Sequence, residues 1–140
     1  LDKLIDTPME HQMQLFESQI KLADSLKKPV IIHCVKAWAE LIEVRKRCKP
    51  TTPWILHGFR GGKQQVEQLS KLGFNFSVGQ FFNTEALTAI SLDSLFLETD
   101  NNCINIREVY SLVSRSFSCK TIDLVRKIDQ NVSQVFKFPL

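Results

Sequence analysis

Hydrophobic and polar positions follow two patterns at the start of the chain. Residues 8–27 carry apolar side chains with a 3.6-residue period after a capping-box sequence at Thr7–Glu10, which predicts an amphipathic helix. Pro29 ends this helix, and residues 30–34 form a continuous apolar run rich in β-branched side chains. Such a run predicts a parallel strand that is buried on both faces. The chain therefore opens with a helix followed by a buried strand.

The same succession of helix and strand patterns recurs to the end of the chain. Further strands are predicted at residues 54–59, 74–78 and 95–99, and further helices at 37–48, 64–72, 84–90, 105–117 and 121–136. Gly73 is expected to adopt a left-handed conformation after a helix, and Asn83 and Asn105 are expected to cap helices. This alternation, at a spacing of roughly 20 residues, predicts a parallel sheet with right-handed crossovers.

Two α/β architectures fit this pattern, a doubly wound open sheet and part of a (β/α)8 barrel. A closed barrel needs eight strands and typically about 250 residues, so the barrel interpretation places roughly half of the fold outside this sequence. The chain has 140 residues, of which 44% are hydrophobic and 24% charged, as in one globular domain. Because no linker or low-complexity segment interrupts the pattern, we expect a single domain over residues 1–140.

Charge and cysteine content add little to this picture. The formal net charge of +3 does not by itself indicate a nucleic-acid partner, and the basic run at residues 45–47 is more typical of a solvated helix face than of a phosphate-binding patch. The four cysteines show no zinc-finger spacing, which favours a reduced, cytoplasmic location. No apolar run is long enough for a membrane span, so no membrane partner is expected. The pattern indicates no particular oligomeric state.

Chemically capable side chains stand where three of the predicted strands end. His33, His57 and Asp100 each follow an apolar run, and the carboxyl ends of parallel strands meet at one rim of an α/β fold. Two imidazoles and a carboxylate suit zinc or another transition metal that activates water. Each residue also has a purely structural interpretation, as a hydrogen-bonded histidine or a turn-forming aspartate. Glu98 points the same way as Asp100 by strand alternation, so it is a candidate base or a residue that contacts a ligand.

A second candidate follows His57 directly. Glycines before a helix leave backbone N–H groups open to an anion, and Arg60, which precedes Gly61 and Gly62, offers a bidentate phosphate contact. The alternative is a plain turn with an exposed arginine. Neither the Walker spacing nor the dinucleotide-binding spacing is present.

Several of these segments together resemble the TatD-type metal-dependent deoxyribonucleases, whose members are amidohydrolase-like barrels. The resemblance covers essentially the whole chain but only the carboxyl-terminal part of the family's barrel, which implies about four β/α units of a TIM-like (β/α)8 fold with parallel strands and alternating helices. The segments that carry it are Pro29–His33, Ile55–Gly61, Leu72–Phe74, Ser77–Gly79 and Leu95–Asp100.

The resemblance implies a metal-dependent hydrolase that cleaves phosphodiester bonds in DNA or in another phosphate ester, with Mg²⁺, Mn²⁺ or Zn²⁺ as the cofactor. His33, His57 and Asp100 are the implied metal ligands, and Asp100 is also implied to take a proton from the metal-bound water. Arg60 and Lys36 are expected near the path of the phosphate.

Part of the family's ligand set has no counterpart in this sequence. The H-x-H pair is absent, and Leu1-Asp2 resembles the end of the G-E-x-G-L-D stretch that carries the family's glutamate ligand. We therefore expect weak metal affinity and little or no activity from this chain alone. The alternative from another class is a non-catalytic α/β module, or a degenerate barrel, with a ligand-binding or signalling role.

Overall fold

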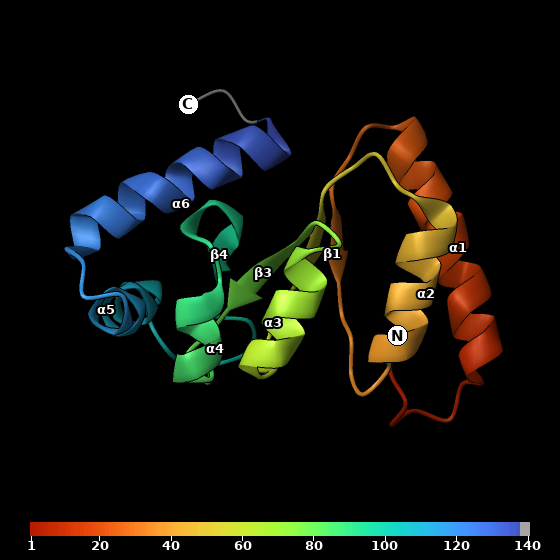
Figure 1. Cartoon of the computed structure of the whole chain (residues 1–140), viewed down its shortest axis with the longest axis horizontal. Helices are drawn as coiled ribbons and strands as arrows, with labels where there is room; N and C mark the ends of the chain where they lie inside the picture. The colour runs from red at the N-terminus through yellow and green to blue at the C-terminus, as the bar shows by residue number, and fades with distance from the viewer. Residues whose placement is uncertain (138–140) are drawn as a thin grey trace.

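The computed structural model describes residues 1–137, and its helices and strands alternate along the chain (Figure 1). In chain order the elements are α1 (Met9–Ser25), β1 (Val30–Ile32), α2 (Trp38–Cys48), β2 (Trp54–Leu56), α3 (Lys63–Ser70), β3 (Phe74–Val78), α4 (Thr84–Ala89), η1 (Leu92–Ser94), β4 (Leu95–Leu97), α5 (Ile106–Ser116) and α6 (Thr121–Phe136).

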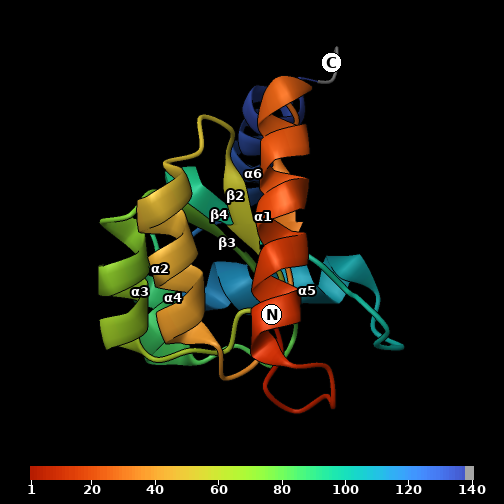
Figure 2. The ribbon, with the colours of Figure 1, turned by 90° about the vertical axis from the view of Figure 1, so that its right-hand side faces the viewer.

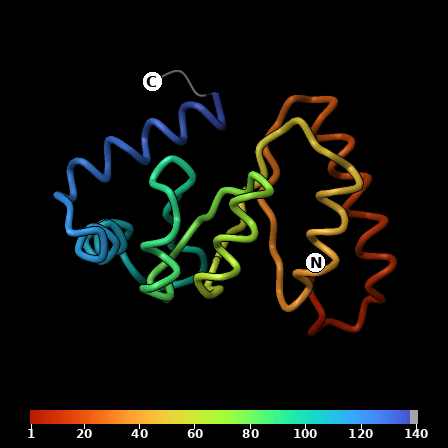
Figure 3. Tube along the Cα trace, viewed as in Figure 1, coloured from red at the N-terminus to blue at the C-terminus, as the bar shows by residue number. Residues whose placement is uncertain are grey.

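The strands form one parallel sheet in the order β1-β2-β3-β4, which is also their order in the chain. The trace in Figure 3 shows the helices between the strands returning the chain so that successive strands run the same way. A doubly wound sheet needs a point at which the strand order reverses, and this sheet has none. That alternative is therefore wrong, and the sequential order is the one that a barrel uses.

The two faces of the sheet have different surroundings. Figure 2 shows α2, α3 and α4 together on one side, which we call the outer face. Paired residues from the four strands point into the core there: Ile32, Leu56, Phe76 and Leu95. The opposite, inner face carries Ile31, Ile55, Ser77 and Phe96, and the last turn of α6 reaches it, with the ring of Phe136 centred 6.2 Å from that of Phe96.

The apolar run of the first strand predicted burial on both faces, but in the structure one face of β1 is exposed. Ile31 is 60% exposed, whereas its partner Ile55 on β2 is 3% exposed. The physical reason is position: β1 lies at one edge of the sheet, and α6 lies near β4 at the other edge. An apolar run specifies a strand, but it does not say which of its faces the rest of the chain will cover.

Element ends differ modestly from the sequence predictions. Strands β1, β2 and β4 end two or three residues earlier than predicted, although His57 N–H still donates to Ile32 O (3.1 Å) and Glu98 N–H to Val78 O (3.1 Å). The capping box at Thr7 is wrong, because Pro8 is the N-cap and no side chain caps the helix. The caps at Asn83 and Asn105 and the left-handed Gly73 (φ 75°) are confirmed.

Arg45 is not part of a solvated helix face. Its guanidinium lies 4.9 Å above the ring of Trp54 and 5.5 Å above that of Phe74, and its Nε donates to Leu72 O at 3.0 Å. Burial in this position lowers the pKa of Arg45. The side chain joins α2 to the aromatic residues at the start of β2 and β3.

A carboxylate makes a second polar link near the start of the strands. Asp24, near the end of α1, accepts hydrogen bonds from the backbone N–H and hydroxyl groups of both Thr51 and Thr52. Burial alone would raise the pKa of Asp24, but the hydrogen bonds from Thr52 and Thr51 outweigh it, so the pKa is lowered.

Within residues 1–137 no helix combines the length and the apolar character that crossing a membrane requires.

Candidate metal centre at the carboxyl rim of the sheet

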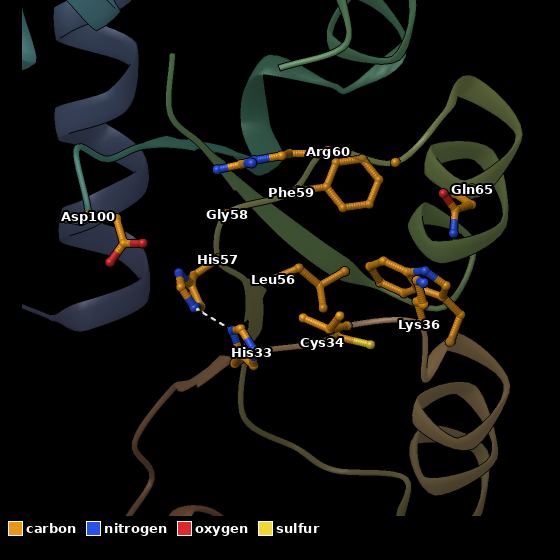
Figure 4. Close-up of a pocket in the computed structure, with 13 residues that line it drawn as sticks. His33, Cys34, Lys36, Leu56, His57, Gly58, Phe59, Arg60, Gln65 and Asp100 are labelled. Carbon is orange, nitrogen blue, oxygen red and sulfur yellow. Dashed lines mark hydrogen bonds between the residues drawn. The ribbon is translucent and has the colours of Figure 1, made fainter. Parts of the chain in front are cut away.

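Two histidines lie side by side at the carboxyl ends of β1 and β2. His33 and His57 directly follow the two strands, and the parallel register places them next to each other. His33 Nδ1 lies 3.2 Å from His57 Nε2, and the ring centroids are 5.4 Å apart (Figure 4). The prediction that these two strand ends meet is therefore confirmed.

Each histidine has a carboxylate on its far side. Asp2 Oδ2 lies 3.2 Å from His33 Nε2, and Glu98 Oε1 lies 3.4 Å from His57 Nδ1. The four side chains thus form a continuous row in the order carboxylate, imidazole, imidazole, carboxylate. Glu98 lies beside His57, and its role as a base or as a residue that supports a ligand stays a prediction.

Asp2 is the member of this row that sequence reasoning missed. It is held by the segment before α1, which runs parallel to the chain after β1: Val35 N–H donates to Leu1 O at 2.9 Å, and Lys3 N–H donates to Val35 O at 3.1 Å. The backbone N–H of Leu4 and, more weakly, His33 lower the pKa of Asp2, so its carboxylate is an acceptor at neutral pH. The one available signal was the resemblance of Leu1-Asp2 to the end of a ligand-bearing stretch.

The donor set of the two imidazoles fits a metal ion. If the outer nitrogens donate to Asp2 and Glu98, the inner nitrogens of His33 and His57 both present lone pairs to the space between them. Two imidazole nitrogens bound to one tetrahedral zinc ion stand about 3.3 Å apart, given Zn–N bonds of about 2.0–2.1 Å, and the observed separation is 3.2 Å. Residues 1–137 nevertheless gather no group of three or more His, Cys, Asp or Glu side chains around one metal position.

Asp100 lines the same cavity but stands apart from the histidine pair. Figure 4 shows its carboxylate across the space beyond His57. Its backbone is left-handed (φ 48°), a conformation that costs a non-glycine residue roughly 1–2 kcal/mol. Strained conformations of this kind gather at functional sites because the surrounding structure must hold them. The assignment of Asp100 as a ligand stays a prediction.

The cavity between these groups has a volume of about 620 Å³, within the range of small-molecule sites. Its apolar wall includes Trp38 and Phe59, whose rings meet edge to face at 5.9 Å. Two cations, Lys36 and Arg60, also line it, and Lys36, like Asp100, has a left-handed backbone (φ 54°). The sequence prediction that both cations stand near the candidate site is consistent with this placement.

The turn after His57 depends on glycine. Gly58 has φ 61°, a left-handed conformation that would be strained for a larger residue, whereas a Cβ at this position would make only an ordinary contact with Glu98 Oε1 at 3.6 Å. The N–H of Gly62 is not open to an anion, because it donates to Gln65 Oε1 at 3.2 Å. That part of the anion-site expectation is wrong, and Arg60 as a phosphate contact stays a prediction.

Cys34 follows His33 and is partly buried. Burial raises the pKa of its thiol to about 11. The side chain packs against the core, as expected of a small apolar residue.

Comparison with known proteins agrees with this geometry. Residues 1–137 match the sequence model of the family described as TatD related DNase. The chain is 38% identical over 104 residues to the human 3'-5' RNA nuclease TATDN2, covering 67% of this chain and 14% of that protein. It is 33% identical over 107 residues to an uncharacterized metal-dependent hydrolase of Haemophilus influenzae, covering 71% of this chain and 41% of that protein.

A solved structure supports the fold over nearly the whole chain. The crystal structure of YjjV, a TatD homolog from Escherichia coli, superposes with a TM-score of 0.88 at 26% identity and covers 99% of this chain and 62% of its own. The prediction of about four β/α units of a TIM-like barrel is therefore confirmed. The chain spans less than half the length of the two curated relatives named above.

Proposed function

The chain belongs to the TatD related DNase family, and on that premise we propose that its paired histidines are part of a metal-dependent centre that hydrolyses phosphodiester bonds in nucleic acid. The observation that carries this proposal is the 3.2 Å separation of His33 Nδ1 and His57 Nε2, with a carboxylate behind each ring. The inner nitrogens are hydrogen-bonded to each other in this structure, and with the outer nitrogens donating to the carboxylates both inner nitrogens would be free to hold one ion. The names of the relatives, an RNA nuclease and a metal-dependent hydrolase, support the same class of chemistry.

Each residue of the rim has a distinct role in this proposal. His33 and His57 hold a divalent ion (Mg²⁺, Mn²⁺ or Zn²⁺), which supplies Lewis acidity toward a phosphoryl oxygen and lowers the pKa of a water molecule. Asp2 and Glu98 fix the tautomer and orientation of the two rings. Asp100, on the same cavity, contributes a further ligand and accepts a proton from the attacking water.

The cations of the cavity bind the substrate. Lys36 and Arg60 both line it, and a guanidinium binds two phosphate oxygens at once through its parallel N–H groups. Because the described residues supply two clustered ligands rather than three or more, we expect weak metal binding and low activity from this chain by itself.

Calorimetric titration with Mn²⁺ tests the centre. We expect weak binding to the wild-type chain, and a loss of the binding heat in both His33→Ala and His57→Ala. His11→Ala is the matched control, because His11 is the remaining histidine of the chain and is exposed near the start of α1. Binding that survives both rim substitutions, or that is lost in the control as well, would contradict the proposed centre.

Hydrolysis is measured separately on a labelled single-stranded oligonucleotide with and without added Mn²⁺. Cleavage that needs the metal and disappears with His57→Ala supports a phosphodiesterase. Cleavage that proceeds without added metal, or that survives His57→Ala, would contradict the proposed chemistry.

A further inference from the structure

Phe81 is an exposed aromatic side chain at the rim of the candidate centre. It lies in the loop between β3 and α4, and 55% of its surface is exposed. The ring also lines a small polar hollow at this rim, so its exposed part is accessible to a ligand that binds there. The next residue, Phe82, shows the ordinary arrangement, because it packs against the core.

Arg60 supports the exposed ring from one side. The guanidinium carbon lies 5.1 Å from the centre of the Phe81 ring, within the range of a cation–π contact. Arg60 comes from the turn after His57, so the contact joins the loops that follow β2 and β3. Within residues 1–137 no second aromatic ring stacks on Phe81, and the exposed part of the ring is available to a ligand.

Phe81 and Arg60 lie next to the candidate metal centre. A small hollow on the same rim brings the ring and the guanidinium together with two carboxylates near the candidate centre. It is lined by Arg60, Phe81, Glu98 and Asp100, among others. In Figure 4 the Arg60 side chain extends toward the side of the site that holds Asp100. A group stacked on Phe81 would therefore lie beside the point where a phosphate is attacked.

We propose that Phe81, backed by Arg60, is a specificity-determining platform that stacks an unpaired nucleobase next to the scissile phosphate. This inference rests on the proposed phosphodiesterase function and names how its substrate is held. A nucleobase presents a flat face to an aromatic ring, and such stacking tolerates any sequence. A guanidinium that stacks on a ring keeps its N–H groups free at its edge, where they bind phosphate oxygens. A base inside a duplex has both faces covered by its neighbours, so the platform selects single strands or frayed ends.

Binding of two matched oligomers separates the stacking contact from the phosphate contact. The first is a fluorescein-labelled single-stranded oligothymidylate, and the second has the same length and charge but carries tetrahydrofuran spacers without bases. Dissociation constants are measured by fluorescence anisotropy at low salt for the wild type, Phe81→Ala, Phe81→Trp and Arg60→Ala. Leu15→Ala is the control, since Leu15 is an exposed apolar residue on α1.

We expect Phe81→Ala to weaken binding of oligothymidylate about tenfold or more and to leave binding of the spacer oligomer unchanged. Phe81→Trp restores the affinity for bases, and Arg60→Ala weakens binding of both oligomers and reduces the salt dependence. Leu15→Ala matches the wild type. Because Phe81 is exposed, its substitutions should leave the unfolding temperature nearly unchanged, which circular dichroism verifies.

Equal affinity of wild type and Phe81→Ala for oligothymidylate would overturn the platform, as would a wild type that binds both oligomers equally or neither. The proposed function is judged independently, by metal-dependent cleavage of the spacer oligomer, which contains phosphodiesters and no bases. If the chain cleaves the spacer oligomer but binds both oligomers with equal affinity, the stacking platform is refuted while the proposed phosphodiesterase function stands.

Discussion

Asp2→Asn tests how the histidine pair is oriented. The carboxylate of Asp2 accepts a hydrogen bond from Leu4 N–H at 2.8 Å through Oδ1 and faces His33 Nε2 at 3.2 Å through Oδ2. An asparagine keeps an oxygen for Leu4 and turns an N–H₂ group toward His33. That donor stabilises the tautomer in which Nε2 is the acceptor and the proton lies on Nδ1, which faces His57 and would block a metal ion.

The expected loss of metal affinity in Asp2→Asn depends on how exposed the contact between Asp2 and His33 is to water. Removing a partner that orients a metal-binding histidine typically weakens metal affinity about 10- to 100-fold. The side chain of His33 is 57% exposed, so water can replace part of the lost contact. We therefore expect a loss of about tenfold in Mn²⁺ affinity, at the lower end of that range.

Two measurements check this reasoning. Calorimetry gives the Mn²⁺ affinity, and ¹⁵N-detected NMR of the histidine rings reports which nitrogen of His33 carries the proton. Asp6→Asn is the matched control, because it removes the same charge from an exposed residue of the same segment. Unchanged affinity together with an unchanged tautomer in Asp2→Asn would refute the role that we assign to Asp2.

Three further outcomes are expected. At about pH 8, Cys34 should react with a thiol reagent more slowly than the exposed Cys103, as peptide mapping would show, because burial raises the pKa of Cys34 to about 11; faster labelling of Cys34 would contradict this. Gly73→Ala should lower the free energy of unfolding by about 1 kcal/mol or more in a urea titration, since Gly73 has φ 75° and a new Cβ would lie 3.2 Å from Arg45 Nη2. Asp24→Ala should lower the free energy of unfolding by about 1–2 kcal/mol at neutral pH. That difference should vanish as the pH falls through the lowered pKa of Asp24, because a carboxylate with a depressed pKa stabilises the fold only while ionised; a difference that persists in acid would argue against its hydrogen bonds as the cause.

The order and type of the elements could be predicted because each depends on local pattern. The apolar runs, the proline after α1 and the caps at Asn83 and Asn105 act over a few residues, and the structure agrees with them. Burial depends instead on what packs nearby. The exposure of Ile31 and the stacking of Arg45 on Trp54 and Phe74 arise from contacts between distant segments, which a residue's own neighbours in the sequence do not encode.

The candidate site was predictable only in part, for a similar reason. His33 and His57 were identifiable because strand ends in a parallel sheet meet at one rim, and Glu98 followed from strand alternation. Asp2 was not, because it reaches His33 through the pairing of Leu1–Lys3 with Val35, outside any regular strand. The stacking of Phe81 on Arg60 joins two irregular loops and had no sequence signal of its own.

His33 directly follows the edge strand β1, so metal binding at the rim affects the stability of that strand. An edge strand opens locally at a lower free energy than a central one, and β1 is held through contacts such as Val30 N–H to Pro53 O at 2.9 Å. An ion that binds His33 and His57 together would fasten β1 to β2 and raise the free energy of that opening. Hydrogen exchange at the Val30 amide should then slow when metal is added. The metal centre would therefore also stabilise the edge strand β1 against local opening.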